Sequence, residues 1–149
     1  MSLSAKVMTA LKEAMKSKDQ TALTALRAVK SAILLAQTES GAKEELTEEQ
    51  ELKLLQKQVK QRKDSAAVYI DQGRDDLAEP ELAEAKVIEQ FLPEAMSEED
   101  IAKVVEDIIA KTGAEGMKDM GKVMGMASKE LAGRADGKTI SNIVKAKLA

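Results

Sequence analysis

The chain has 149 residues, which suits one ordinary domain or two small ones. It contains no His, Cys or Trp, so the usual general base, the thiol nucleophile and the nitrogen or sulfur metal ligands are missing, and we expect no metal and no cofactor. The net charge of −3 and a sequence pI near 5.2 argue against strong unspecific binding to nucleic acid. Only Tyr69 and Phe91 are aromatic, which excludes a base-stacking platform.

The N-terminal residues predict two antiparallel helices. Apolar side chains recur about once per turn, first from Leu3 to Met15 and then from Leu23 to Ile33. Asp19 lies between the two runs as the expected N-cap of the second helix, and Gly41 is expected to end that helix. The first residues include Lys, Glu and Asp where a signal peptide needs an unbroken apolar stretch. We therefore expect a cytoplasmic protein without a membrane span.

A long third helix is expected from Glu48 to Gln72, where Gly73 stops it. Thr47 and Gln50 have the spacing of a capping box at its start. Such a helix usually carries a solvated charged face. Basic residues at helical spacing form a stripe along it that is a secondary candidate for binding an anionic partner: Lys53, Lys57, Lys60, Arg62 and Lys63.

A fourth helix is expected to begin with Asp75 or Asp76 as its N-cap. Pro80 then lies close enough to the start to be tolerated, because N–H groups of the first turn have no acceptor within the helix. Pro93 breaks the chain after this helix. The expected domains are an N-terminal helical domain, residues 1–95, and a small C-terminal helical domain, residues 96–149.

Three shorter helices are predicted in the C-terminal domain. The first is capped by Ser97 and ends at Gly113. The other two span about 118–131 and 139–148, and Asp136 is the expected N-cap of the last. The predicted fold class of the whole chain is therefore all-α.

Three residues have the spacing of a phosphate-binding loop: Gly116, Gly121 and Lys122. That loop requires a buried strand before it and a Ser or Thr after the Lys to hold magnesium. Here a helical pattern precedes the glycines and Val123 follows the Lys. We therefore expect no ATP or GTP site.

The two glycines at 121 and 125 share one face of their helix, because residues four apart lie above one another. Each costs about 0.8 to 1 kcal/mol of helix propensity, so a close contact must compensate. One interpretation is a tight helix crossing within the core, and the other is a surface that admits a large partner. The spacing leaves both open.

Charge distinguishes the C-terminal end. Residues 117–149 hold seven basic and three acidic side chains, a net charge of +4. Residues 96–116 hold two basic and six acidic side chains, a net charge of −4, and residues 1–95 have a net charge of −3. An anionic partner is therefore expected to approach with the C-terminal end foremost.

Several motifs together resemble one family. They are "LRAVKSAI" at 26–33, "VKQRKDS" at 59–65, "FLPEAMSEED" at 91–100, "DMGKVMG" at 119–125 and "GRADG" at 133–137. With them the chain resembles the YqeY family over essentially its whole length. That family is similar in turn to the C-terminal tail of GatB, the B subunit of the glutamine-dependent tRNA amidotransferase.

The resemblance implies a helical N-terminal domain, a small helical C-terminal domain and association with tRNA, with the catalytic chemistry located elsewhere. By motif, it implies that Gly121, Lys122, Gly125 and Lys138 face the RNA. Charge and helix position add the remaining candidates, so that the full set of tRNA-binding candidates is Lys118, Gly121, Lys122, Gly125, Lys129, Arg134, Gly137 and Lys138. No catalytic residue is expected.

Three functions follow from these observations. The first is a non-catalytic accessory protein that binds tRNA or a tRNA enzyme, with tRNA, an amidotransferase or an aminoacyl-tRNA synthetase as partner. The second is a protein–protein adaptor. The third, a component of a carbon–nitrogen ligase that uses glutamine as amido donor, is disfavoured because the chain has no Gly/Ser-rich amidase region and no nucleotide site. The sequence does not separate the first function from the second.

Overall fold

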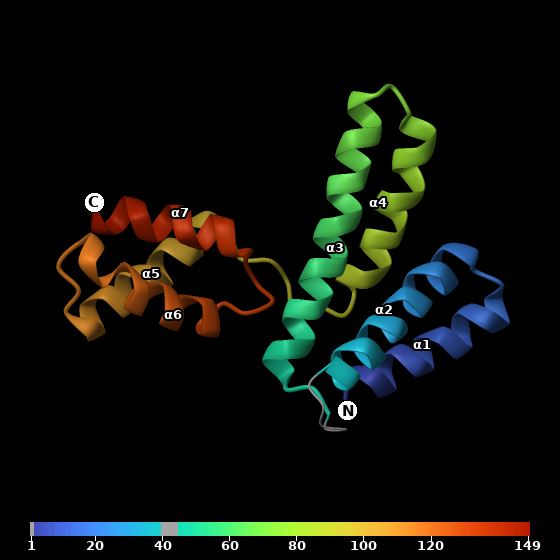
Figure 1. Cartoon of the computed structure of the whole chain (residues 1–149), viewed down its shortest axis with the longest axis horizontal. Coiled ribbons are helices and arrows are strands. Elements are labelled where there is room, and N and C mark those ends of the chain that lie inside the picture. The colour runs from blue at the N-terminus through green and yellow to red at the C-terminus, as the bar shows by residue number, and fades with distance from the viewer. Residues whose placement is uncertain (1, 40–44) are drawn as a thin grey trace. The chain divides into compact units, whose positions relative to one another are not determined.

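The computed structural model describes residues 2–39 and 45–149 and is all-α in these ranges, which confirms the predicted fold class (Figure 1). The end of the second helix predicted at Gly41 lies outside the described residues. The helices are α1 Leu3–Ser17, α2 Gln20–Glu39, α3 Glu48–Asp71, α4 Asp75–Glu89, α5 Glu98–Thr112, the short 3₁₀-helix η1 Met117–Asp119, α6 Met120–Glu130 and α7 Gly137–Leu148.

The chain divides into two compact units, Met1–Leu92 and Pro93–Ala149. Each unit has its own cluster of buried aliphatic side chains. Independent folding of two domains with a boundary between residues 95 and 96 stays a prediction.

The ends of the N-terminal helices follow from local capping. The Ser2 hydroxyl accepts a hydrogen bond from the Ala5 N–H at 3.2 Å at the start of α1. Asp19 accepts one from the Ala22 N–H at 3.1 Å and so caps α2, as the sequence predicts. Thr47 and Gln50 form the predicted capping box of α3, with bonds of 3.2 and 2.9 Å.

The predicted start of the fourth helix is wrong by one or two residues. Arg74 occupies the N-cap position and makes no side-chain cap bond, whereas both aspartates lie in the first turn of α4. Their negative charges are favourable there because the N-terminal end of a helix dipole is positive. Pro80 consequently falls in the second turn, inside the helix.

In the N-terminal unit, α1 packs along α2, α2 packs against α4, and α3 and α4 form a long antiparallel pair (Figure 1). Three buried alanines, Ala66, Ala78 and Ala85, lie in α3 and α4 and allow the two backbones to approach closely. Leu26 of α2 and Leu55 of α3 belong to the main cluster of buried side chains. The burial of these apolar side chains is the main stabilising contribution.

The C-terminal unit is a bundle of α5, α6 and α7. Each helix contributes a fully buried valine: Val105, Val123 and Val144. Ser97 caps α5, and Gly113 ends it in the left-handed conformation at φ 66°, as the sequence predicts. Because α5 is a helix where a phosphate-binding loop needs a strand, the glycine spacing that follows is not such a loop.

Candidate nucleic-acid interface

Helix α6 has one buried and one bare face. Val123 and Ala127 point into the C-terminal core and are 0% exposed, whereas Gly121 and Gly125 are exposed to solvent. A Cβ atom added at either glycine would meet nothing within 4 Å. The interpretation of these glycines as a tight helix crossing within the core is therefore wrong, since no other described helix of the C-terminal unit packs on that face.

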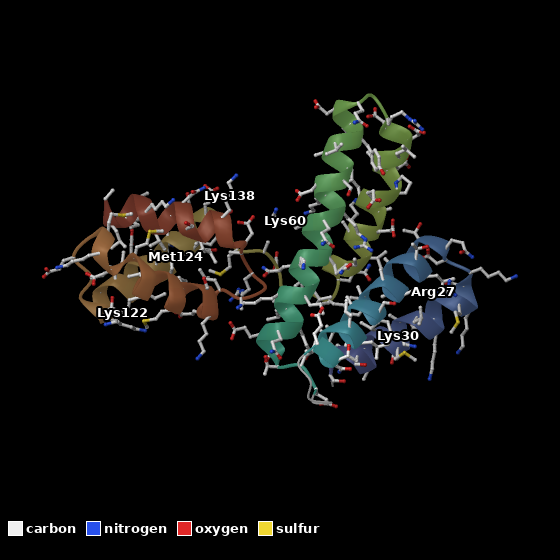
Figure 2. The ribbon with its side chains drawn as sticks, viewed as in Figure 1. Arg27, Lys30, Lys60, Lys122, Met124 and Lys138 are labelled. Atoms are coloured by element: carbon white, nitrogen blue, oxygen red, sulfur yellow. The ribbon has the colours of Figure 1, made fainter. Side chains whose placement is uncertain are left out.

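Three lysines lie close in sequence to the two exposed glycines. Lys118 lies in η1 and Lys129 lies in α6, each with an exposed side chain. Lys122 of α6 is exposed as well (Figure 2). None of the three forms an ion pair with a residue in the described ranges. Lys129 follows Gly125 by four positions and so lies one turn along the same face. Lys122 directly follows Gly121 in the sequence. The exposed backbone at the two glycines therefore lies next to positive charges that have no carboxylate partner among the described residues.

The loop between α6 and α7 is held by its backbone. Gly133 is buried and has φ 79°, a left-handed conformation that favours glycine. The Arg134 carbonyl accepts a hydrogen bond from the Met96 N–H at 3.0 Å, which ties the loop to the start of the unit. The Arg134 side chain is exposed and adds a further positive charge without an ion pair to any described residue.

The N-terminus of α7 is only partly available to a ligand. The Asp136 carboxylate accepts a hydrogen bond from the Thr139 N–H at 2.6 Å, so it is the N-cap that the sequence predicts. Gly137 and Lys138 follow it and are exposed, and Figure 2 labels the Lys138 side chain. Because the carboxylate occupies one N–H group and opposes an anion, this end is weaker than the α6 face as a phosphate site.

The basic stripe on α3 is largely neutralised within the N-terminal unit. Lys53 pairs with Glu49 at 3.1 Å and Lys60 pairs with Asp64 at 3.2 Å, each one helical turn away. Lys63 pairs with Glu89 of α4 at 2.7 Å. Only Lys57 is exposed without an ion pair to a described residue, so the stripe offers little free charge to a partner.

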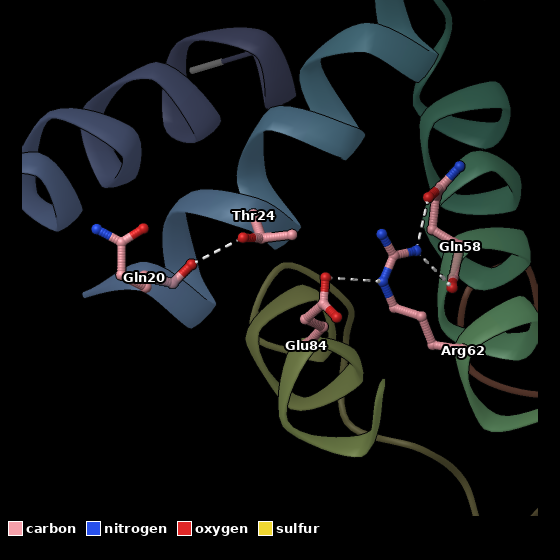
Figure 3. Close-up of polar contacts among 5 residues, drawn as sticks. All are labelled: Gln20, Thr24, Gln58, Arg62 and Glu84. Carbon is pink, nitrogen blue, oxygen red and sulfur yellow. Dashed lines mark hydrogen bonds and ion pairs between the residues drawn. The ribbon is translucent and has the colours of Figure 1, made fainter. Parts of the chain in front are cut away.

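Arg62 does not extend this stripe outward, contrary to the expectation. Its side chain is only 13% exposed and lies between α3 and α4, where Glu84 is 15% exposed (Figure 3). Arg62 Nη1 donates to Gln58 Oε1 at 2.8 Å and to the Gln58 carbonyl at 3.1 Å. Arg62 Nε lies 3.9 Å from Glu84 Oε1, and within the described residues it has no hydrogen-bond acceptor. It is therefore a structural cation and not a surface one.

The surroundings of Glu84 disfavour its charged form. Burial raises the pKa of the Glu84 carboxyl above its ordinary value of 4.5. The nearby Arg62 charge acts in the opposite direction and lowers this pKa, and Glu81 adds a smaller increase. The attraction between Arg62 and Glu84 therefore offsets only part of the cost of burying these charges between α3 and α4.

Two exposed cations on α2 are not among the candidates predicted from the sequence. Arg27 and Lys30 are exposed and lie one turn apart on this helix (Figure 2). Summing charge over residues 1–95 concealed them, because the acidic residues of α3 and α4 outweigh the basic ones of α1 and α2. A charge count over each helix pair would have found them.

Neither a metal-binding cluster nor a membrane-crossing helix is found among the described residues. Among residues 2–39 and 45–149, no three His, Cys, Asp or Glu side chains are grouped so that they could hold a metal ion. Within the same ranges, no helix combines the length and the apolar character that crossing a membrane requires.

The chain is similar to fungal and archaeal proteins. It is 33% identical over 139 residues to altered inheritance of mitochondria protein 41, mitochondrial, of Kluyveromyces lactis, covering 91% of this chain and 70% of that protein. The protein of the same name from Pyrenophora tritici-repentis is 32% identical over 127 residues, with 84% and 68% covered. One subunit of the glutamyl-tRNA(Gln) amidotransferase of Thermococcus gammatolerans is 36% identical over 73 residues.

The amidotransferase match is local, since it covers 46% of this chain and only 12% of that archaeal protein. The fungal relatives are named mitochondrial, so a cytoplasmic location stays a prediction for this chain. The family described as Yqey-like protein matches residues 4–148. Because that match spans nearly all of the sequence, the chain belongs to the YqeY family.

Proposed function

We propose that this chain is a non-catalytic accessory protein that binds tRNA by its shape and backbone through the C-terminal unit. The observation that carries the proposal is the α6 face, where exposed Gly121 and Gly125 lie among lysines without ion pairs to described residues. A local match to a component of a tRNA amidotransferase supports the choice of tRNA as partner.

The composition favours this mode of recognition. With one Tyr and one Phe, the chain has few rings on which bases could stack. Contacts to phosphate and sugar position a protein on a folded RNA without reading its bases. Two exposed glycines one turn apart let a phosphate approach the helix backbone closely, and the neighbouring lysines supply the charge.

An adaptor function is the second candidate. It is favoured by large apolar side chains that are exposed on the α3–α4 hairpin, among them Val68 at 55%, Ile70 at 52% and Leu82 at 40%. Side chains of this kind are common in protein–protein interfaces, although single exposed ones need no explanation. A chain that binds no tRNA but retains a protein partner would favour this function.

Lys122→Ala is expected to weaken tRNA binding by removing one phosphate contact. The magnitude of the slope of log K against log salt should fall by roughly one, and the helix content should not change. The measurement is a titration of a tRNA transcript with the full chain at several KCl concentrations between about 50 and 200 mM.

Lys57→Ala is the matched control, because Lys57 is exposed and has no ion pair with a described residue. This variant should keep the wild-type slope. If wild type shows no binding at low salt, the proposed function is wrong. If both variants lose binding equally, the contact surface does not lie on α6.

Gly125→Ala is expected to separate stability from binding. The position is exposed within α6 and a methyl group would meet nothing within 4 Å, so the free energy of unfolding should rise by about 0.5 to 1 kcal/mol. The added side chain should nevertheless weaken tRNA binding, and Gly125→Gln should weaken it further. Thermal unfolding and the same titration check the two effects.

The matched control for the added Gln side chain is Ala110→Gln. Ala110 is an exposed helical position on α5, away from the α6 face that carries Gly121 and Gly125. It should leave tRNA binding unchanged. If Gly125→Gln binds tRNA as tightly as wild type, the bare face is not a contact surface.

A further inference from the structure

The N-terminal unit has a strongly uneven charge distribution. Residues 1–39, which include α1 and α2, hold six basic and three acidic side chains, a net charge of +3. Residues 45–92, which include α3 and α4, hold seven basic and twelve acidic side chains, a net charge of −5. The helix pair α1–α2 is thus a positive surface in a unit that is negative as a whole.

Ion pairing increases the difference in available positive charge between α1–α2 and α3–α4. Of the seven cations in α3, α4 and their connection, five pair with carboxylates: Lys53, Lys60, Arg62, Lys63 and Arg74. Six cations lie in α1, α2 and the turn between them: Lys6, Lys12, Lys16, Lys18, Arg27 and Lys30. None of them forms an ion pair with a carboxylate in the described ranges. The positive charge on α1–α2 is therefore available to an external anion.

Arg27 and Lys30 are the best placed of these cations. Both are exposed on α2 (Figure 2), whereas Leu26 and Val29 beside them are buried in the N-terminal core. A well-packed helix thus holds the two cationic side chains one turn apart. The planar guanidinium of Arg27 can bind two oxygens of one phosphate, and Lys30 adds a point charge.

We propose that α1–α2 is a second contact surface for the tRNA backbone, centred on Arg27 and Lys30. This inference rests on the proposed function. The α1–α2 surface resembles the α6 face in the two properties that matter for phosphate binding, exposed cations and the lack of intramolecular carboxylate partners among described residues.

The test compares two double substitutions in the full chain, each of which removes two positive charges from the N-terminal unit. One is Arg27→Gln with Lys30→Gln. The matched control is Lys57→Gln with Lys86→Gln, which removes the two cations of α3–α4 that are exposed and lack an ion pair to described residues. A tRNA transcript is titrated at several KCl concentrations, and circular dichroism verifies that both variants keep their helix content.

The Arg27/Lys30 variant is expected to reduce the magnitude of the salt slope by roughly 1.5, corresponding to two lost phosphate contacts. The Lys57/Lys86 variant should keep the wild-type slope. Equal losses in both variants would overturn the inference, because net charge alone would then explain them.

The outcomes also distinguish the two proposals. If Lys122→Ala weakens binding and the Arg27/Lys30 variant does not, the inference falls and the C-terminal function stands. If only the Arg27/Lys30 variant weakens binding, α1–α2 contacts the RNA and the proposed C-terminal role is wrong. If wild type binds no tRNA, both proposals are wrong.

Discussion

Leu131→Ala is expected to lower the free energy of unfolding of the C-terminal unit by about 2 to 5 kcal/mol, the usual cost of truncating a buried leucine. Leu131 is 1% exposed and belongs to the buried cluster of this unit. A unit of this size has little stability to spare, so its helices should unfold at or below physiological temperature. The N-terminal unit should stay folded if the two units are independent domains.

Hydrogen exchange measured by mass spectrometry checks this result, because it reports protection separately for each helix. In Leu131→Ala, protection should be lost in α5, α6 and α7 and kept in α1 to α4. Leu26→Ala is the matched variant in the other unit, where Leu26 is 2% exposed, and the pattern should be reversed. Loss of protection throughout the chain in either variant would show that the units unfold together.

Arg62→Met is expected to destabilise the N-terminal unit by about 2 to 3 kcal/mol at neutral pH, because it leaves the poorly exposed Glu84 carboxylate without its cation. Met retains an apolar side chain similar to the methylene stem of Arg. The loss of stability therefore measures the removal of the charge more than a change in packing. Denaturant unfolding at pH 7 measures the change.

This cost should depend on pH. Burial already raises the pKa of Glu84, and removing Arg62 takes away the charge that lowers it, so the carboxyl should bind its proton at a higher pH in the variant. A folded-state pKa above the unfolded value means that this group's contribution to stability falls as pH rises through the interval between them. The destabilisation by Arg62→Met should therefore shrink as pH falls toward 4.5, the ordinary value for Glu.

The matched control is the double variant Arg62→Met with Glu84→Gln, which removes both charges from between α3 and α4. It should recover most of the lost stability and show no extra pH dependence in this interval, because no uncompensated carboxylate remains. If the double variant is as unstable as Arg62→Met at neutral pH, packing and not charge accounts for the loss.

Local sequence patterns predicted the helices and most of their ends. The capping bonds made by Asp19, Thr47, Ser97 and Asp136 involve partners only three residues away, so short-range sequence is enough to place them. The start of α4 was missed because two adjacent aspartates suit the first turn of a helix as well as its cap.

The candidate site could be predicted only in part. The positive charge of residues 117–149 and the shared face of Gly121 and Gly125 are visible in the sequence, because a count of charges and the helical repeat reveal them. The same sequence left two interpretations of the glycines, since helical spacing says which residues share a face but not which face is buried. The exposure of both glycines settles that point for the described residues.

The sequence by itself determined the all-α class, the capped helix starts and the polarity of charge along the chain, because these depend on neighbours within one or two turns. Only the tertiary structure decided which cations pair with carboxylates far along the chain. Arg62 and Lys63 pair with Glu84 and Glu89 of α4, more than 20 residues along the chain. These two pairs add to the local pairs of Lys53 and Lys60 within α3, and together they leave the basic stripe largely neutralised. The cations of α1 and α2 have no such partner among the described residues, because their helices pack through apolar faces and leave the charged faces to solvent.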